Sequence, residues 1–143
     1  MLKSGEDIPP IESNDDVYYN RMSNISYTES LRHFHNLVVK YDLIKGVSKP
    51  GDTLIDFAVG KAGDFSKWIS SRLSFVFGLD ISKDNIENRF DGACARFLNN
   101  RKQRENSPYA LFVQANSSLN IRSGAALYSE KDKLITQSVF GDI

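Results

Sequence analysis

The fold is decided by the stretch TLIDFAVGKAGD, residues 53–64. Its first five residues, 53–57, form a β-type run that is short enough for a buried parallel strand. The following AVGKAG is small and glycine-bearing, and it leads into a helix whose Phe65, Trp68 and Ile69 fall on one face. We therefore predict a strand, a tight loop and a helix in succession, with Trp68 in the core.

Two further strands follow in the sequence. Residues 74–79 and 109–114 are β-type runs, and residues 82–106 between them predict a helix that is capped by its first residue and broken near Gly92. Residues 115–124 are loop-like. Alternating strands and helices predict an α/β fold with a parallel sheet and right-handed crossovers, in which ligands bind at the carboxyl ends of the strands.

A leading helix and an arm precede the first strand. Ser26 and Glu29 have capping-box spacing, and Gly46 provides the expected stop of the helix. Its apolar residues recur at intervals of three and four: Leu31, Phe34, Val38 and Tyr41. Residues 1–25 show no sustained period, so we expect a flexible acidic arm there.

Composition excludes several classes of protein. The 143 residues allow one domain or part of a larger one. Eighteen Lys and Arg balance eighteen Asp and Glu, which disfavours nucleic-acid binding by bulk positive charge. The single cysteine, Cys94, excludes an internal disulfide and multi-cysteine zinc sites, and it fits a reducing compartment. We expect a cytoplasmic protein, neither secreted nor inserted in a membrane.

The three strand ends carry candidate ligand-binding residues. After the first strand, Ala58, Gly60 and Gly63 let a nucleotide-like ligand approach the backbone, although the same pattern suits a plain tight turn. After the second, Asp80 can accept the hydroxyl protons of a ribose, or can simply stand near a helix N-terminus. After the third, Asn116 can address the edge of an adenine, or can form an Asx turn.

The other polar residues have simpler interpretations. His33 and His35 are two apart on a helix and point away from each other, so we expect no shared metal site. Cys94 among small neighbours indicates a small buried side chain. A basic run is interpreted as a solvated helix face in preference to a contact with RNA phosphates. That run comprises Arg96, Arg101, Lys102 and Arg104.

Several of these segments together resemble the first half of a messenger RNA cap guanine-N7 methyltransferase, a class I S-adenosylmethionine-dependent enzyme. The resemblance covers roughly residues 31–140. It is carried by Phe34-His35-Asn36, Lys40, Leu43-Ile44, residues 56–64 with Lys67-Trp68, residues 78–82 and residues 112–118. Residues 84–88 and 91–96 add a likeness to the enzymes of large DNA viruses.

The resemblance implies a Rossmann-like methyltransferase domain that begins at residue 26 and continues to residue 143. It implies that Lys40 approaches the methionine carboxylate of S-adenosylmethionine, that Asp80 holds the ribose and that Asn116 faces the adenine. The full implied cofactor set is Lys40, Asp56, Ala58, Gly60, Gly63, Asp80, Asn116 and Ser117. Phe34, His35 and Asn36 would border the cap. No catalytic base and no metal are expected, and the implied partners are the capped 5′ end of mRNA and other capping-enzyme subunits.

The sequence departs from the family pattern at three places. Asn116 stands where the family usually has an acid, and one more residue separates Asn36 from Lys40 than the family has. The chain also ends at Ile143, before the strand and loop that complete the cap pocket in the family. We therefore expect an incomplete sheet, marginal stability and no turnover by this chain alone.

Three other functions remain open from the sequence. A class I methyltransferase with another acceptor would keep the glycine loop but would not need the leading helix. A non-catalytic methyltransferase-like module could instead contact a capping or transcription partner. A nicotinamide dinucleotide-binding domain is the third, although it would have glycine in place of Ala58.

Overall fold

The computed structural model describes residues 28–141 and is built on a three-stranded parallel sheet. The strands are β1 (Thr53–Asp56), β2 (Phe75–Asp80) and β3 (Tyr109–Gln114), in the order β1-β2-β3. The register pairs Asp56 with Gly78 and Asp80 with Gln114. The predicted parallel α/β sheet is confirmed, with strand bounds that differ from the prediction by at most one residue.

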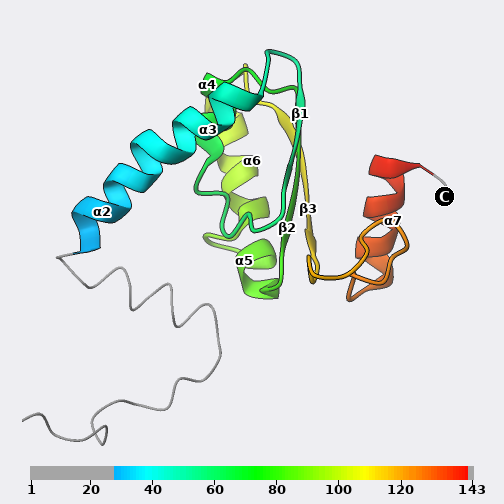
Figure 1. Ribbon diagram of the computed structural model, residues 1–143. Coiled ribbons are helices and arrows are strands. Elements are labelled where there is room, and N and C mark those ends of the chain that lie inside the picture. Colours follow the sequence, from blue (N-terminus) through cyan, green and yellow to red (C-terminus); the bar gives the residue numbers. More distant parts are fainter. Residues whose placement is uncertain (1–27, 142–143) are drawn as a thin grey trace, which may run out of the picture.

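Helices cover both faces of the sheet (Figure 1). One face carries α4 (Phe65–Ser70), α5 (Lys83–Glu87) and α6 (Ala93–Gln103), and the opposite face carries α7 (Glu130–Phe140). The leading helix lies on the side of α4 and extends away from the sheet toward its N-terminus. It comprises α2 (Glu29–Phe34), the π-helical turn η2 (His35–Val39) and α3 (Lys40–Val47).

The leading helix ends later than the sequence suggested. The prediction that Gly46 stops it is wrong, because α3 includes Gly46 and Ser48 is the C-cap in an extended conformation. The Ser48 hydroxyl donates a hydrogen bond to the Ile44 carbonyl at 2.5 Å. Pro50 disfavours a helical Lys49, so the chain must become extended here. The predicted capping residue Ser26 and the arm, residues 1–25, lie outside the described residues.

The predicted break in the second crossover is confirmed, since α5 and α6 are separated by residues 88–92. The Ser82 side chain caps α5 by accepting a hydrogen bond from the Asn85 backbone N–H at 3.2 Å, as expected. Gly92 sits where the chain turns into α6. A Cβ at that position would lie 2.6 Å from the Asn88 nitrogen and 2.7 Å from the Asn88 oxygen.

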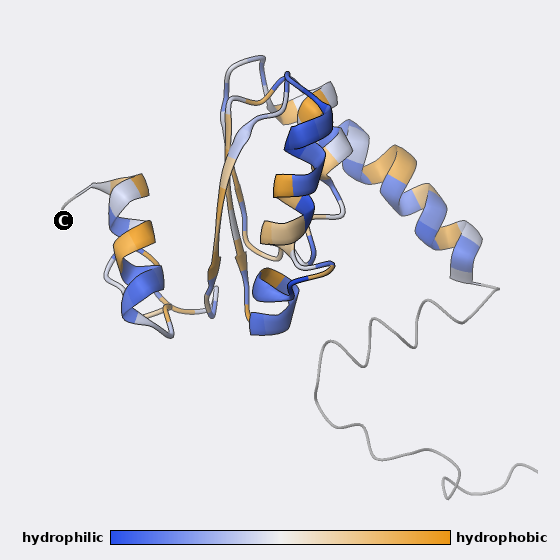
Figure 2. Cartoon of the chain, turned by 180° about the vertical axis from the view of Figure 1, so that it is seen from behind, coloured by the Kyte–Doolittle hydropathy of each residue, from blue (hydrophilic) through white to orange (hydrophobic). Residues whose placement is uncertain are grey.

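Each face of the sheet has its own core, and the apolar strands run between helices of mixed polarity (Figure 2). On the α4 and α6 face, Trp68 is fully buried, and its ring stacks on Phe112 with centroids 6.4 Å apart. The prediction of Trp68 as a core residue is therefore confirmed. Cys94 is only partly buried beside this core, rather than fully as expected, and burial raises the pKa of its thiol.

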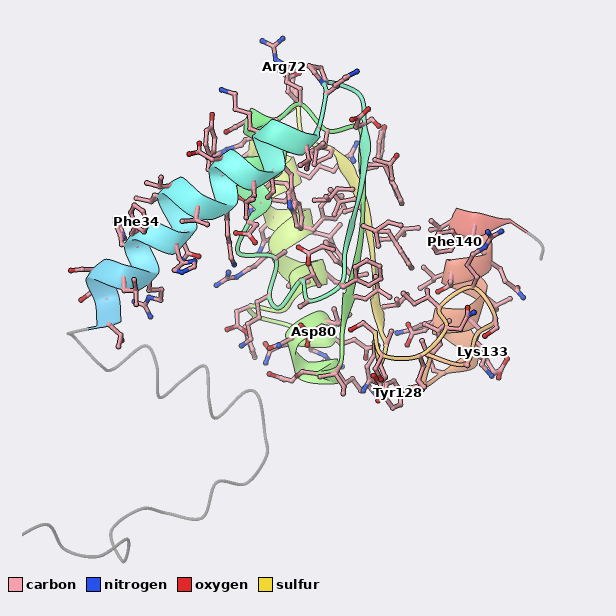
Figure 3. All side chains as sticks on the ribbon, viewed as in Figure 1. Phe34, Arg72, Asp80, Tyr128, Lys133 and Phe140 are labelled. Carbon is pink, nitrogen blue, oxygen red and sulfur yellow. The ribbon has the colours of Figure 1, made fainter. Side chains whose placement is uncertain are left out.

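The second core depends on α7, a helix that the sequence did not predict. Phe77 of β2 is fully buried, and its ring packs edge-on against Phe140 of α7 with centroids 5.6 Å apart. Phe140 and the leading-helix residue Phe34 lie on opposite sides of the sheet (Figure 3). The helix begins at an N-cap, Ser129, whose hydroxyl oxygen accepts the Asp132 N–H at 3.1 Å. It ends before Gly141, which has a φ of 78°.

We expect two glycine substitutions to change stability in opposite directions. Gly92→Ala forces its Cβ against backbone atoms of Asn88 and should lower the free energy of unfolding by about 1–3 kcal/mol. Gly46→Ala should raise it by up to about 1 kcal/mol, because alanine is the better helix former and nothing lies within 4 Å of the added Cβ. Urea denaturation of the two variants measures both changes. Equal midpoints would contradict the described turn at Gly92.

None of the helices within residues 28–141 is long and apolar enough to cross a membrane.

Candidate functional site

The loop after β1 is held against the tip of β2. The Val59 backbone N–H donates to the Leu79 carbonyl at 2.9 Å, and the Gly60 N–H donates to Asp80 Oδ2 at 2.9 Å. Gly60 has a φ of 57°, which glycine adopts without strain. Gly78 lets the loop cross the strand, since a Cβ there would meet Val59 Cγ2 at 2.9 Å. The predicted meeting of these two strand ends is confirmed.

The Asp80 carboxylate is fixed by donors from three segments. Oδ2 accepts from the glycine loop, as described, while Oδ1 accepts from the Ser82 backbone N–H at 2.9 Å and from Asn85 Nδ2 at 3.2 Å. Asp80 itself is half-buried at the end of its strand. Its carboxylate therefore has a defined position and orientation at the tip of the sheet.

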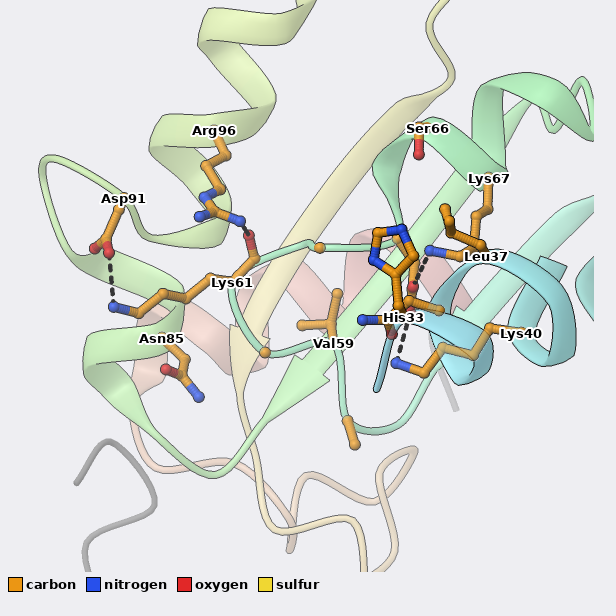
Figure 4. A pocket seen from close by; sticks show the side chains of 15 residues that line it. His33, Leu37, Lys40, Val59, Lys61, Ser66, Lys67, Asn85, Asp91 and Arg96 are labelled. Carbon is orange, nitrogen blue, oxygen red and sulfur yellow. Dashed lines mark hydrogen bonds and ion pairs between the residues drawn. The ribbon is translucent and has the colours of Figure 1, made fainter. Parts of the chain in front are cut away.

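A cavity of about 590 Å³ opens between the leading helix, the glycine loop and the start of α6 (Figure 4). Its size is in the range of small-molecule sites. It is lined by residues of the leading helix, the glycine loop, α4, α5, the α5–α6 loop and α6: His33, Asn36, Leu37, Lys40, Ala58, Val59, Gly60, Lys61, Gly63, Asp64, Ser66, Lys67, Asn85, Asp91 and Arg96. Four cationic side chains face two carboxylates in this set, so the lining favours ligands with anionic groups.

Asp64 joins the leading helix to the body of the protein. One carboxylate oxygen pairs with Lys67 Nζ at 2.8 Å and the other with Lys40 Nζ at 3.4 Å. Lys67 is buried, whereas the Lys40 side chain is 49% exposed. Because the exposed ion pair is worth little in stability, Lys40 can exchange Asp64 for another anion at small cost.

A second ion-pair network borders the opposite side of the cavity. Lys61 of the glycine loop pairs with Asp91 at 2.9 Å and lies 4.0 Å from Asp84. The Arg96 guanidinium reaches the Lys61 carbonyl oxygen at 3.5 Å. The loop between α5 and α6 is thereby tied to the glycine loop, and two cations are kept at the cavity edge.

Asp56 closes the turn beneath the glycine loop. Its Oδ1 accepts the Ala58 backbone N–H at 3.0 Å. Burial raises the pKa of the Asp56 carboxyl above its ordinary value, and the hydrogen bond from Ala58 lowers it in part. The negative charge of Asp64 raises this pKa further, whereas the positive charge of Lys40 lowers it. The carboxyl shapes the loop and does not line the cavity.

The structure gathers five of the residues implied by the resemblance around the cavity: Asn36, Lys40, Ala58, Gly60 and Gly63. Asn36 and Lys40 both face the cavity, although one more residue separates them than in the family pattern. A π-helical turn takes up one more residue than an α-helical turn, and η2 spans His35–Val39. Phe34 and His35 do not line the cavity, and His33 and Leu37 do.

Asn116 and Ser117 follow β3 outside the cavity lining. Asn116 Oδ1 accepts hydrogen bonds from the Ser118 backbone N–H at 3.1 Å and from the Ser118 hydroxyl at 2.7 Å. Of the two possibilities that the sequence left open, the Asx turn is therefore formed. The turn uses the side-chain oxygen of Asn116 and does not use the amide nitrogen.

Several cavity residues were not predicted from the sequence. Lys61 could have been found from its place inside the glycine loop. Arg96 was interpreted as part of a solvated helix face, but it lies one helical turn after Gly92 and lines the cavity. Asn85 had no local signal, because its position against Asp80 depends on how α5 leaves the strand. Across residues 28–141, no three His, Cys, Asp or Glu side chains gather as a metal site would require.

The parallel sheet, its flanking helices and a cavity beside the glycine loop are consistent with a Rossmann-like methyltransferase fold. Residues 14–131 match the family model of the mRNA (guanine-N(7))-methyltransferase domain. The chain belongs to this family.

Individual relatives agree with this assignment. The chain is 39% identical over 64 residues to an mRNA cap guanine-N(7) methyltransferase of Saccharomyces cerevisiae, covering 45% of this chain and 14% of that protein. It is 29% identical over 101 residues to a probable mRNA-capping enzyme of Acanthamoeba polyphaga mimivirus. This match covers 71% of this chain and 8% of the viral protein. It is 37% identical over 83 residues to an mRNA cap guanine-N(7) methyltransferase of Eremothecium gossypii. This match covers 58% of this chain and 18% of that protein. The chain thus spans less than a fifth of these relatives.

Proposed function

We propose that this chain is the cofactor-binding part of an enzyme that transfers the methyl group of S-adenosylmethionine to N7 of the terminal guanine of capped RNA. The observation that carries the proposal is the hydrogen bond between the Gly60 N–H and the Asp80 carboxylate at the strand tips. This bond places the backbone of the glycine loop, which a ligand can approach closely, beside the Asp80 carboxylate, which can accept hydrogen bonds from ribose hydroxyls. Family membership supports the reaction.

The residues present fit the cofactor by their chemistry. Lys40 offers a partly exposed ammonium for the methionine carboxylate, and Ala58 and Gly60 leave room beneath the ligand. Asp80 offers acceptors for the ribose, while Asn116 and Ser117 would border the adenine. Asp56 would act indirectly by shaping the loop, whereas Gly63 lines the cavity directly. The cavity volume of about 590 Å³ suits a ligand of this size.

The cap would enter from the side of the leading helix. Asn36 faces the cavity there, with Phe34 and His35 on the same helix as the remaining proposed cap residues. The cationic side chains Lys61 and Arg96 at the opposite edge suit the phosphates that join the cap to the transcript. The cavity therefore combines a helix wall with a positive rim.

The chemistry asked of the protein is small. S-adenosylmethionine supplies a methyl group already activated on a sulfonium, and guanine N7 is already nucleophilic. The chain's residues need only align the two and provide a suitable electrostatic environment. No described side chain is assigned as a catalytic base.

The proposed partners follow from the same reaction. They are the capped 5′ end of mRNA and other subunits of a capping enzyme, in keeping with the longer relatives that the chain matches. The likeness to the mimivirus protein and the single cysteine suit the cytoplasm of a virus-infected cell or the virion.

Calorimetric titration of the 143-residue chain tests the proposal. We expect binding of S-adenosylmethionine, no binding of NAD, and binding of the cap analogue GpppG to the cofactor-loaded chain. GpppG binding would favour a cap acceptor over other acceptors, and NAD binding would point to a dinucleotide-binding domain. A folded chain that binds none of the three would favour a non-catalytic module and overturn the proposal.

A further inference from the structure

Asn85 is a buried polar residue whose side chain is not needed for its own helix. It lies in the first turn of α5, and only 3% of it is exposed. Its backbone N–H satisfies the Ser82 cap, so the side-chain amide is free for another role. Asn85 is one of the residues that line the cavity (Figure 4).

The Asn85 amide contacts the Asp80 carboxylate, which stands at the end of β2 next to the cavity but is not one of its lining residues. Its Nδ2 donates to Asp80 Oδ1 at 3.2 Å, beside the Ser82 N–H on the same oxygen. The other oxygen, Oδ2, accepts from Gly60. The two backbone donors come from the glycine loop and from the residue that caps α5, and Asn85 is the side chain that holds the carboxylate between them.

We propose that Asn85 is a positioning residue that orients the Asp80 carboxylate toward the ribose hydroxyls of the bound nucleoside. This inference rests on the proposed function, because it requires that Asp80 hold a ribose. The amide donates one hydrogen bond without neutralising the carboxylate, as a lysine or arginine would. It therefore restricts the rotation of the carboxylate. The three donors occupy three of its four lone-pair sites, so one site, on Oδ2, stays open for a hydroxyl donor.

The test compares two ligands on matched variants of the 143-residue chain. The probes are S-adenosylhomocysteine and its 2′,3′-dideoxy analogue, titrated calorimetrically. Asn85→Ala removes the donor, and Asn85→Asp keeps the shape of the side chain but places a second carboxylate against Asp80. The control is Asn100→Ala, which truncates an asparagine on α6 whose side chain donates a hydrogen bond to the Arg96 carbonyl.

Asn85→Ala should weaken binding of S-adenosylhomocysteine about tenfold, as expected for one lost hydrogen bond to a charged group. Asn85→Asp should weaken it further, and Asn100→Ala should leave it unchanged. Neither Asn85 variant should weaken binding of the dideoxy analogue by more than about twofold, because this ligand lacks the hydroxyls that Asp80 holds. In an Asp80→Ala background, Asn85→Ala should cause no further loss.

Equal losses for both ligands would show that Asn85 only supports the local fold, and the inference would be overturned. Unchanged affinity in Asn85→Ala would overturn it as well. Thermal denaturation of each variant identifies any that does not fold, and Asn85→Ser then replaces it in the comparison. If the unmodified chain folds but binds neither ligand, the proposed function itself fails, which separates that outcome from a failure confined to Asn85.

Discussion

Asp80→Ala should weaken S-adenosylmethionine binding on the order of 100-fold or more. The side chain is the proposed acceptor for the ribose hydroxyls, and hydrogen bonds to a charged group are worth about 1.5–3 kcal/mol each. The substitution also frees the Gly60 N–H from its 2.9 Å bond, so the glycine loop loses its tie to the tip of β2. Calorimetric titration of the folded chain measures the loss.

Two variants accompany this measurement. Asp80→Asn keeps the size of the side chain and one acceptor oxygen. Its affinity for S-adenosylmethionine should therefore lie between that of Asp80→Ala and that of the unmodified chain. Asp42→Ala removes an exposed carboxylate from α3 and should leave the affinity unchanged. If the affinity of Asp80→Ala for S-adenosylmethionine is within about threefold of that of the unmodified chain, the carboxylate does not hold the ribose and the proposed site is wrong.

The largest expected effect on stability comes from Phe77→Ala. Phe77 is fully buried between β2 and α7, against the ring of Phe140. Truncating a buried phenylalanine costs about 3–5 kcal/mol, which is a large part of the roughly 5–15 kcal/mol that holds a typical domain folded. Urea or thermal denaturation should therefore show a strongly lowered transition, or no cooperative transition at all.

Phe90→Ala is the matched control, since the same atoms are removed from a side chain that is 89% exposed. Surface changes of this kind stay within about 0.5 kcal/mol. Similar losses in the two variants would contradict the packing of α7 on the sheet. An unchanged Phe77→Ala would show that this second core is not formed in solution.

The strands were readable from the sequence because each is a short apolar run bounded by turn residues. Trp68 was readable as a core residue from its helical spacing with Phe65. The strand ends also followed, because parallel strands place their carboxyl ends at one edge of the sheet, so the loop at Gly60 and the carboxylate of Asp80 were expected to meet there.

Gly46 was misjudged because a glycine ends a helix only where the following chain needs its conformational freedom. The chain instead turns at Ser48, two residues before Pro50. The helix α7 was not expected, since its apolar residues are few and acquire their role only against the sheet, where Phe140 meets Phe77. Local periodicity carries too little information about such a helix.

The sequence by itself determined the parallel α/β class, the glycine loop and the two carboxylates, Asp56 and Asp80, at the ends of the first two strands. Only the tertiary structure decided which side chains share the cavity. It places His33 rather than His35 on the cavity side, and it gathers Lys61, Asn85 and Arg96 from three separate segments. It also commits the side-chain oxygen of Asn116 to an Asx turn. The physical reason is that strand ends follow from chain direction, whereas the direction in which a helix leaves its strand is set by long-range packing.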